Sequence, residues 1–447
     1  MRSILTLFFL LPYCLLVVVI PGAAADPQDP QGTASLWEQW ERAAEEGVKD
    51  PLLRWHYYYK DGLRIDSREK SFQFRLNGRI LGDGGYTGAD DLLDRDFTDF
   101  EGWHFNLRDL RLSMVLTLYQ RVELKIASDF SHVRDIKDEW IRLKKIPWIG
   151  TVTAGHMKEP FSLEELTSTR DLTFMERALP TEAFVPGRNF GVSQQTTLLN
   201  QRMTYAMGVF LNTGSYSNQG DAGEEISDAN GWNITARVTG LPWYEDKGRR
   251  LLHLGLSYTH QFRNLGDDGA ELRTRPESRL TDVRLVDTGK FTTRGMDRIN
   301  SELALVSGPF SLQGEHFQMF VDSDGTGDPS FWGLYLFGSW FLTGEHRNYQ
   351  RSKGVFSRIR PQCDFHFSGK GWGALEAALR FSFIDLNGGA VRGGREYDLT
   401  AGLDWYLNKS IRLMFNYVWA KARDRETPLP VEDGTAHIVQ ARLQMVF

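Results

Sequence analysis

The chain has 447 residues, of which 41% are hydrophobic and 13% aromatic, with 43 glycines and a formal net charge of −6. Its mean hydropathy is −0.38, and no run of 18 apolar residues follows the first 20 positions. This excludes membrane-spanning helices from the rest of the chain. The only cysteines, Cys14 and Cys363, exclude a thiolate metal site. We expect no metal, no cofactor and no nucleic-acid partner.

Residues 1–25 predict a cleaved export signal. Arg2 precedes an apolar run over residues 4–20, and three alanines follow, so the mature chain is expected to begin near Asp26. An uncleaved anchor is the alternative, because the apolar run approaches the length of a bilayer span. Removal of the signal leaves 58 acidic against 51 basic residues, a net charge of −7. It also leaves Cys363 without a disulfide partner.

Residues 26–56 form the expected periplasmic N-terminal segment. The spacing of Leu36, Trp40, Ala43, Ala44 and Val48 predicts a short amphipathic helix over about 34–48, ended by Gly47 and the Asp50-Pro51 pair. A poorly ordered leader is the alternative.

From Ser71 onward the hydrophobic period changes to two. Phe72, Phe74 and Leu76 alternate with Gln73 and Arg75, so one face of this segment contacts an apolar medium and the other contacts water. Similar alternation recurs in 110–118, 122–126, 232–239, 252–261, 375–382, 403–407 and 411–419. One such segment also suits a soluble sandwich, whereas many of them, at about the 9–11 residues of a membrane strand, predict a transmembrane β-barrel over residues 57–447.

The connections between these segments are very unequal in length. The first two hairpin strands meet at Tyr119-Gln120, a tight turn of the periplasmic kind, whereas long polar stretches predict external loops. These stretches cover residues 83–102, 215–230, 264–297, 322–328 and 423–434.

The chain ends in an alternating strand closed by an aromatic residue. Val439, Ala441, Leu443, Met445 and Phe447 share one face. A last strand of this kind with a terminal Phe resembles the signal that bacterial barrel-assembly machinery reads, so that machinery is an expected partner.

Several segments resemble the phosphate-selective porin O/P family of outer-membrane channels. The most distinctive is Gly155–Glu164 (GHMKEPFSLE), which continues through 166–171 and 174–180 to 186–189. Others are 59–65, 76–80, 107–112, 341–345, 403–408 and 412–418. Together they cover about residues 57–447 in the family's order.

The resemblance implies a trimeric antiparallel barrel of about sixteen strands in the bacterial outer membrane, in contact with lipid and lipopolysaccharide. It also implies a third external loop that folds into the lumen. The residues independently predict a long non-strand excursion over Pro160–Arg188, because alternation is weak there and three prolines occur.

A diffusion channel selects by the width of its pore and by the charges that line it. The predicted polar faces carry eleven basic and eight acidic residues. The basic set is Arg75, Arg79, Arg111, Arg121, Lys125, Arg237, Arg358, Arg360, Arg380, Arg412 and Arg442, and the acidic set is Asp83, Asp109, Glu123, Asp129, Glu302, Glu315, Glu376 and Asp404. Arginine suits an anion path because its planar fork binds phosphate or carboxylate and stays charged. The alternative is that these arginines pair with the acids across strands.

In the family, lysine and neighbouring hydroxyls at the inward loop bind phosphate, and Thr167-Ser168-Thr169 resembles that hydroxyl cluster. The predicted constriction residues are Lys158, Ser162, Thr167, Ser168, Thr169, Arg170, Arg177, Arg188, Arg75, Arg79, Arg108, Arg111, Arg121 and Lys125. This chain departs from the family where Glu164-Glu165 and Asp109 place acids, which leaves a general, weakly selective pore as the alternative function. No G-x-S-x-G or H-E-x-x-H motif occurs, so we expect no enzyme.

Overall fold

The computed structural model describes residues 55–447, apart from 68, 98, 132–134, 213–230, 264–268, 324, 326, 370 and 429. The predicted signal over 1–25 and the predicted helix over 34–48 both lie outside the described residues.

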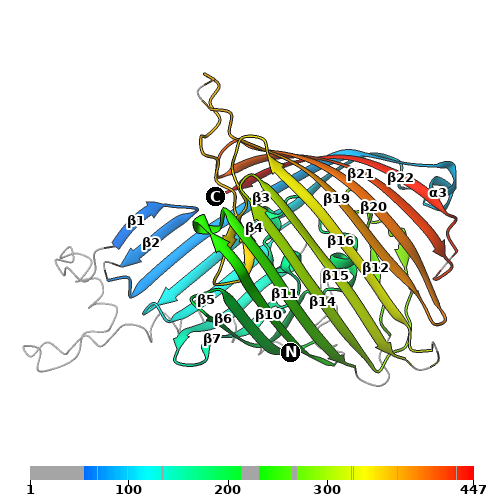
Figure 1. The fold of residues 1–447 in the computed structure, drawn as a ribbon, viewed down its shortest axis with the longest axis horizontal. Coiled ribbons are helices and arrows are strands. Elements are labelled where there is room, and N and C mark those ends of the chain that lie inside the picture. The colour runs from blue at the N-terminus through cyan, green and yellow to red at the C-terminus, as the bar shows by residue number, and fades with distance from the viewer. Residues whose placement is uncertain are drawn as a thin grey trace, which may run out of the picture. The chain divides into compact units, whose positions relative to one another are not determined.

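Sixteen antiparallel strands form a closed barrel (Figure 1), as the family resemblance implies. They are β3 (Phe72–Ala89), β4 (Gly102–Leu118), β5 (Val122–Asp129), β6 (Asp135–Ile146), β7 (Gly150–Lys158), β8 (Arg188–Leu198), β9 (Met203–Leu211), β10 (Trp232–Glu245), β11 (Arg250–Phe262), β14 (Gly295–Ser307), β15 (Phe310–Asp322), β16 (Ser330–Phe341), β19 (Ala374–Gly388), β20 (Val391–Tyr406), β21 (Ile411–Arg425) and β22 (Gly434–Val446).

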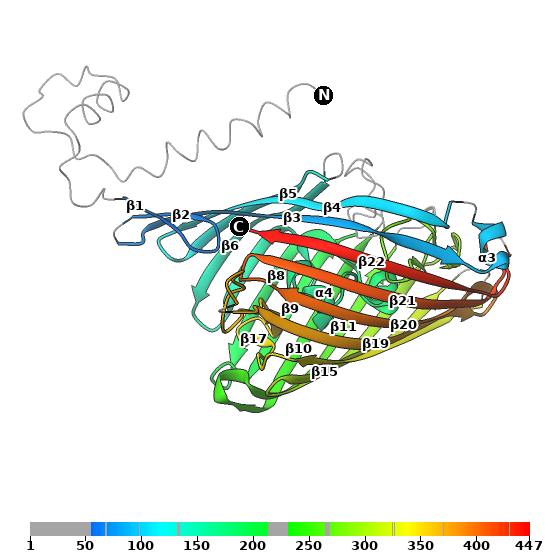
Figure 2. The ribbon, with the colours of Figure 1, turned by 90° about the horizontal axis from the view of Figure 1, so that it is seen from above.

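The barrel closes where its last strand pairs with its first. β22 lies beside β3 (Figure 2), in a register that pairs Val446 with Arg79 and Ala436 with Ala89. The terminal Phe447 completes the ladder, because its amide donates to Gly78 O at 3.0 Å and its carbonyl accepts from Gly78 N at 2.9 Å. Closure of this kind leaves no unpaired edge in the ring of sixteen described strands.

A short hairpin continues the wall beyond the C-terminus. It consists of β1 (Trp55–Tyr59) and β2 (Leu63–Ser67). β2 pairs with residues 73–76 of β3, which precede the residues of β3 that pair with β22. The sheet therefore contains eighteen strands, of which sixteen form the closed ring.

The connections differ between the two ends of the barrel. At the end that carries Phe447, hereafter the C-terminal end, most are short turns such as 119–121 and 308–309. The exception is residues 342–373, which include β17 (Asn348–Gln350) and β18 (Val355–Ser357). The opposite end, hereafter the loop end, carries the long connections, including α3 (Asp91–Asp96), α4 (Leu163–Leu166), α5 (Leu179–Phe184), β12 (Arg273–Thr274) and β13 (Val286–Asp287).

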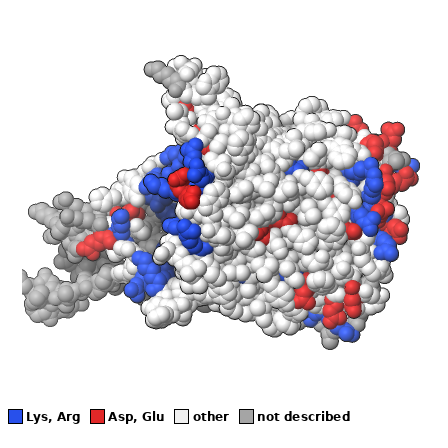
Figure 3. All heavy atoms as spheres, in the orientation of Figure 1, with Lys and Arg blue, Asp and Glu red and all other residues white. Residues whose placement is uncertain are grey.

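Side chains alternate between the two faces of the wall as the sequence predicts. Outward positions such as Leu303, Phe415 and Val439 are exposed and apolar, whereas inward neighbours such as Glu302 and Asn416 are buried. On the face drawn in Figure 3, charged side chains gather toward the two ends and leave a largely uncharged middle. None of the described helices is long and apolar enough to cross a bilayer.

One side of the lumen is packed with apolar side chains. Phe161, Phe174 and Phe184 of residues 159–187 contact Phe317 and Phe337, which point inward from β15 and β16. Residues from the 263–294 connection, such as Leu272 and Phe291, join this cluster. Burial of each such side chain contributes about 2 kcal/mol, so both connections are fixed against the inner wall of β14–β19.

We expect Gly78→Leu to impair barrel closure, because a Cβ at Gly78 would lie 2.6 Å from the ring of Phe447. The measurement is the fraction of unheated protein that migrates as folded barrel on gels. Gly82→Leu is the matched control, since nothing lies within 4 Å of its Cβ position on the same strand. Equal folded fractions for the two variants would contradict the expectation.

Candidate functional site

The connection between β7 and β8, residues 159–187, makes contacts with strands across the barrel from its own attachment. The amides of Leu163 and Glu164 donate to the Glu315 carboxylate on β15 at 3.0 and 2.8 Å. Farther along, Leu179 N donates to Ser382 Oγ on β19, and Arg412 on β21 donates to Leu172 O at 2.7 Å. Contacts with the buried inner side chains of these strands place the segment along the inside of the wall.

A buried carboxylate fixes the start of this segment. Glu159 is 1% exposed and accepts hydrogen bonds from Asn189 and Asn233, both at 2.7 Å, and from Thr235. Burial raises the pKa of Glu159, whereas these donors lower it, and burial is the larger effect. The segment thus leaves β7 at a rigid point shared with β8 and β10.

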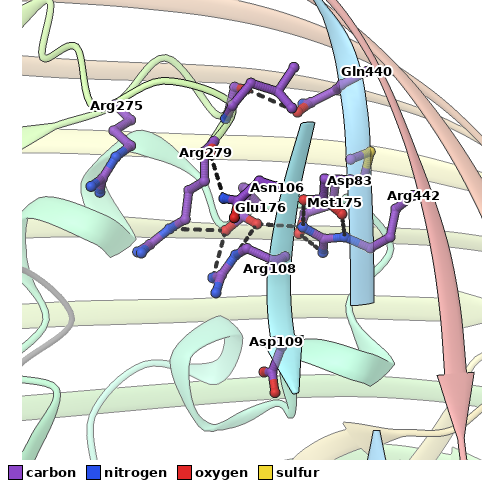
Figure 4. A network of polar contacts seen from close by, with 12 residues as sticks. Asp83, Asn106, Arg108, Asp109, Met175, Glu176, Arg275, Arg279, Gln440 and Arg442 are labelled. Atoms are coloured by element: carbon purple, nitrogen blue, oxygen red, sulfur yellow. Dashed lines mark hydrogen bonds and ion pairs between the residues drawn. The ribbon is translucent and has the colours of Figure 1, made fainter. Parts of the chain in front are cut away.

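Glu176 fixes the middle of the segment through three arginines (Figure 4). Its carboxylate accepts from Arg108 on β4 at 2.7 Å and from Arg442 on β22 at 2.6 Å, and Arg279 approaches to 3.3 Å. Burial alone would raise the pKa of Glu176, but Arg108 and Arg442 outweigh it and hold the pKa well below its usual value. Arg442 also binds Asp83, so the network joins the segment to the closing strands.

The open space lies against the other side of the barrel. A cavity of about 460 Å³ is bounded by the inner faces of β3–β10 and by residues 158–170 and 353–355. Ten basic and two acidic side chains line it. They are Arg75, Arg79, Arg111, Lys125, Arg142, Lys158, Arg170, Arg188, Arg237 and Lys353 against Glu123 and Asp138.

The structure brings nine of the fourteen predicted constriction residues to this cavity. They are Arg75, Arg79, Arg111, Lys125, Lys158, Ser168, Thr169, Arg170 and Arg188.

The other five predicted residues lie elsewhere. Ser162 caps α4 by accepting from Glu165 N, and Thr167 donates to Leu163 O at 2.8 Å. Arg177 pairs with Glu165, Arg108 pairs with Glu176, and Arg121 is exposed in the β4–β5 turn. The first four therefore hold the segment in shape and do not line the cavity.

Many of the lining cations are paired, as the cross-strand alternative predicts. Arg79 binds Asp109, and Lys125 binds Asp138 at 2.7 Å. Lys158 pairs with Glu165 at 2.8 Å. Burial raises the pKa of Glu165, but Arg177 and Lys158 outweigh it and lower the pKa to about 2, so this acid stays ionised.

Two arginines keep larger parts of their side chains in the cavity. The side chain of Arg75 is 35% exposed and that of Arg170 is 33% exposed, and their nearest carboxylates lie at 3.8 and 3.6 Å. Ser168 and Thr169 line the same space beside Arg170. These groups have donors to offer to a solute.

Residues 342–373 enter the lumen from the C-terminal end. Arg237 on β10 donates to Gly354 O at 2.8 Å, and the Tyr349 hydroxyl lies 2.6 Å from His253 Nδ1 on β11. This contact brings Lys353 to the cavity. Burial and the nearby cations Arg142 and Lys125 lower the pKa of Lys353 to about 8.

Sequence reasoning missed Lys353 and two residues of β6. Arg142 and Trp140 line the cavity, where the guanidinium of Arg142 lies 3.9 Å from the centre of the Trp140 ring. A polar outward residue, Glu139, hides the alternation of this strand. Arg358 and Arg360, assigned to a strand face from sequence, belong instead to the 342–373 connection and approach Asp61 in the β1–β2 turn.

Comparisons with known proteins agree with this architecture. Residues 74–447 match the family described as phosphate-selective porin O and P. The chain is 25% identical to porin O of Pseudomonas aeruginosa over 426 residues, which cover 87% of this chain and 91% of that protein. It is also 28% identical over 404 residues to an uncharacterized protein of Caulobacter vibrioides, covering 87% and 76% of the two chains.

Solved structures share the fold at low identity. The outer membrane channel DcaP of Acinetobacter baumannii matches with a TM-score of 0.51 and 12% identity, over 86% of this chain and 99% of that one. OmpF of Salmonella typhi gives 0.50 and 11%, over 87% and 100%. The trimer form of OmpT from Vibrio cholerae gives 0.50 and 9%, over 84% and 100%.

We expect Glu176→Ala to widen the open path without unfolding the sheet. The change removes a carboxylate partner from buried Arg108 and Arg442. Breaking buried ion pairs of this kind lowers the stability by about 3–5 kcal/mol, so residues 159–187 are held less firmly. Single-channel recordings should then show larger conductance steps. The control is Glu432→Ala, which removes an exposed carboxylate paired with Arg95 at the loop end. Unchanged step size in Glu176→Ala would contradict the role of this network.

Proposed function

This chain belongs to the phosphate-selective porin O and P family, and we propose that its cavity conducts small anions, with phosphate or polyphosphate-like solutes preferred. The family and the barrel make it a porin of the bacterial outer membrane. The observation that carries the finer proposal is the ratio of ten basic to two acidic side chains around one cavity. A passive channel needs no catalytic group, and selection follows from width and charge.

The charge of the cavity opposes the charge of the whole chain. The chain carries a formal net charge of −6, so its overall field does not attract anions from a distance. Salt screens charges beyond about 8 Å at physiological ionic strength, whereas partly buried charges are screened less. Selection therefore rests on the local cations, after an anion has entered by diffusion.

The geometry favours an oxyanion over a halide. Arg75 and Arg170 present planar forks whose parallel N–H groups match two oxygens of phosphate. Ser168 and Thr169 lie on the same lining and add hydroxyl donors. Because most of the other lining cations are already paired with carboxylates, the solute is shared among a few donors and is released easily.

A general, weakly selective pore is the second candidate. The ion pairs of Arg79, Lys125 and Lys158 favour it, because each compensates a cation that would otherwise attract an anion. The two candidates differ in whether phosphate binds in the pore or only passes through it.

The route of the chain to the outer membrane and its orientation there form part of the proposal. We propose that residues 1–25 are cleaved during export, that barrel-assembly machinery reads the last strand through Phe447, and that the loop end faces outward. Long connections on one side and short turns on the other are typical of outer-membrane barrels. Acidic loop residues such as Asp91 and Asp94, both in α3, then face lipopolysaccharide.

We further propose that the chain assembles as a homotrimer. A trimer form is described for OmpT of Vibrio cholerae, which shares the fold, and homo-oligomers commonly have closed cyclic symmetry.

Phosphate should block chloride current through single channels in planar bilayers. We expect Arg170→Gln to raise the blocking concentration about fivefold, because loss of one partly exposed charge-assisted contact costs ~1 kcal/mol. Arg423→Gln, an exposed outward position on β21, is the control. Large steps that phosphate never blocks would support the general pore instead.

Anion selectivity should fall as pH rises from 7 to 9. Lys353 has a pKa of about 8, so it is charged below this pH and neutral above it. The measurement is the reversal potential in a salt gradient at each pH. Lys353→Met should give low selectivity at both values, whereas Lys247→Met, in an exposed turn, should keep the dependence. A wild-type reversal potential that does not change with pH would exclude Lys353 from the path.

A further inference from the structure

The last part of the 342–373 connection forms a small hairpin on the outside of the barrel. His366 N donates to Gly371 O at 3.0 Å, so the arms on either side of this pair, within residues 363–373, run antiparallel. Figure 1 shows the hairpin as the gold trace that projects from the C-terminal end, beyond the ribbons of the wall. Its surface is mostly uncharged in the same orientation (Figure 3). The barrel therefore leaves this part of the connection uncovered.

The base of the hairpin is attached to the lipid-facing side of β20. Trp405 lies on the same face of this strand as Leu399 and Leu403, which are exposed outward positions. Trp405 Nε1 donates to Trp372 O at 2.7 Å, and the Trp405 ring meets the Phe365 ring edge to face with the centres 5.1 Å apart. Both arms of the hairpin thus begin against a side chain that faces the membrane.

The hairpin carries aromatic side chains that nothing in this chain buries. Phe367 is 99% exposed and Trp372 is 67% exposed. The Phe367 ring meets Phe365 edge to face at 5.0 Å, so the aromatic surface is continuous from the tip of the hairpin to Trp405. A single exposed apolar side chain is ordinary, whereas a contiguous group marks a surface that contacts another apolar phase.

The level at which the hairpin leaves the wall is the level of the membrane interface. Outward aromatic residues stand at the C-terminal end of several strands, namely Phe310 on β15, Trp340 on β16 and Phe447 after β22. Phe310 and Trp340 stack with their ring centres 5.6 Å apart. Aromatic residues of barrels gather where the wall meets lipid headgroups. Trp405 stands near the same end of β20, so the hairpin extends this aromatic band sideways.

We propose that the hairpin of residues 363–373 binds the phospholipid leaflet around the C-terminal end, with Phe367 and Trp372 inserted at the boundary between headgroups and acyl chains. Exposed Trp and Phe on a segment that lies along the membrane surface suit this boundary. With the orientation proposed above, the leaflet is the periplasmic one. The partner is lipid because the hairpin continues the lipid-facing surface of β20.

Membrane binding of the hairpin also bears on the pore, because the same connection reaches into the lumen. Its first half brings Lys353 to the cavity through β17 and β18. Between the two halves, Ile359 is buried in a cluster with Phe341 and Tyr406 at the ends of β16 and β20. A hairpin held by lipid therefore steadies, from outside the wall, the junction from which the inward half extends.

Quenching of a fluorescent label by brominated phospholipid tests the contact. The full chain carries Cys14→Ser and Cys363→Ser, which remove both native thiols, and Phe367→Cys for the label. Folded protein is reconstituted in phosphatidylethanolamine and phosphatidylglycerol vesicles with and without brominated acyl chains. The references are Leu403→Cys on the lipid face of β20 and Lys247→Cys in an exposed turn at the same end of the barrel. We expect loss of fluorescence at positions 367 and 403 and none at 247. A label at 367 that behaves like the one at 247 would overturn the proposal and leave the hairpin to water or to a protein partner.

A second pair of variants tests whether the aromatic side chain holds the hairpin in the leaflet. The label is moved to Ser368→Cys, and Phe367 is replaced by Asp or by Leu. Because Phe367 is almost fully exposed, neither change disturbs packing within the barrel. We expect Phe367→Asp to abolish the quenching by brominated lipid and Phe367→Leu to keep most of it. Equal quenching in the two variants would show that the side chain at 367 does not insert, and the proposal would fail.

Discussion

Backbone hydrogen bonding in a medium without water is the constraint on which this structure depends. Every strand in the lipid must give its amides and carbonyls to neighbours, and only a closed ladder does so for all sixteen strands. The pairing of β22 with β3, completed by Phe447 and Gly78, satisfies the last edge. Because a ring of this size encloses more space than strand side chains fill, the interior becomes a second packing problem.

The chain solves that problem unevenly. Residues 159–187 and 263–294 pack apolar side chains against β14–β19, which closes one side of the lumen. Carboxylates at Glu159, Glu176 and Glu315 then hold the first connection by its backbone and by arginines. The space left beside β3–β10 is the cavity. It is basic because the connections cover the inner face of β14–β19 and leave exposed the part of the wall that carries most of the cations.

The sequence predicts the barrel well wherever one face of a strand is wet. Alternation identifies β3, β4 and β22, and the weak alternation with three prolines over 160–188 identifies the long connection between β7 and β8. Alternation is weaker for β15 and β16, because Phe317, Phe331 and Phe337 point inward to meet the packed connections and add apolar residues to the inner face. It fails for β6, where Glu139 points outward and Trp140 inward. No periodicity predicts that a turn-side connection such as 342–373 brings Lys353 to the cavity, since that depends on contacts with Arg237 and His253.

The charge count along predicted strand faces was nearly balanced, whereas the cavity is strongly basic. The difference arises because seven of the eight predicted acids, all but Glu123, do not line the cavity, whereas five cations from outside the predicted strand faces do line it: Arg142, Lys158, Arg170, Arg188 and Lys353. Pattern alone gives the face on which a residue lies, and only the packing decides whether that face meets solvent.

The uneven filling also bears on how long a solute stays in the channel. Short strands form much of the wall beside the cavity, so the cationic zone along it is brief and offers room for few ions at a time. On the anion path proposed above, transit then depends on how fast an ion leaves the arginine side chains and less on travel along a tube. The same side chains would then set both the affinity for the ion and the current, so tighter binding would lower the current.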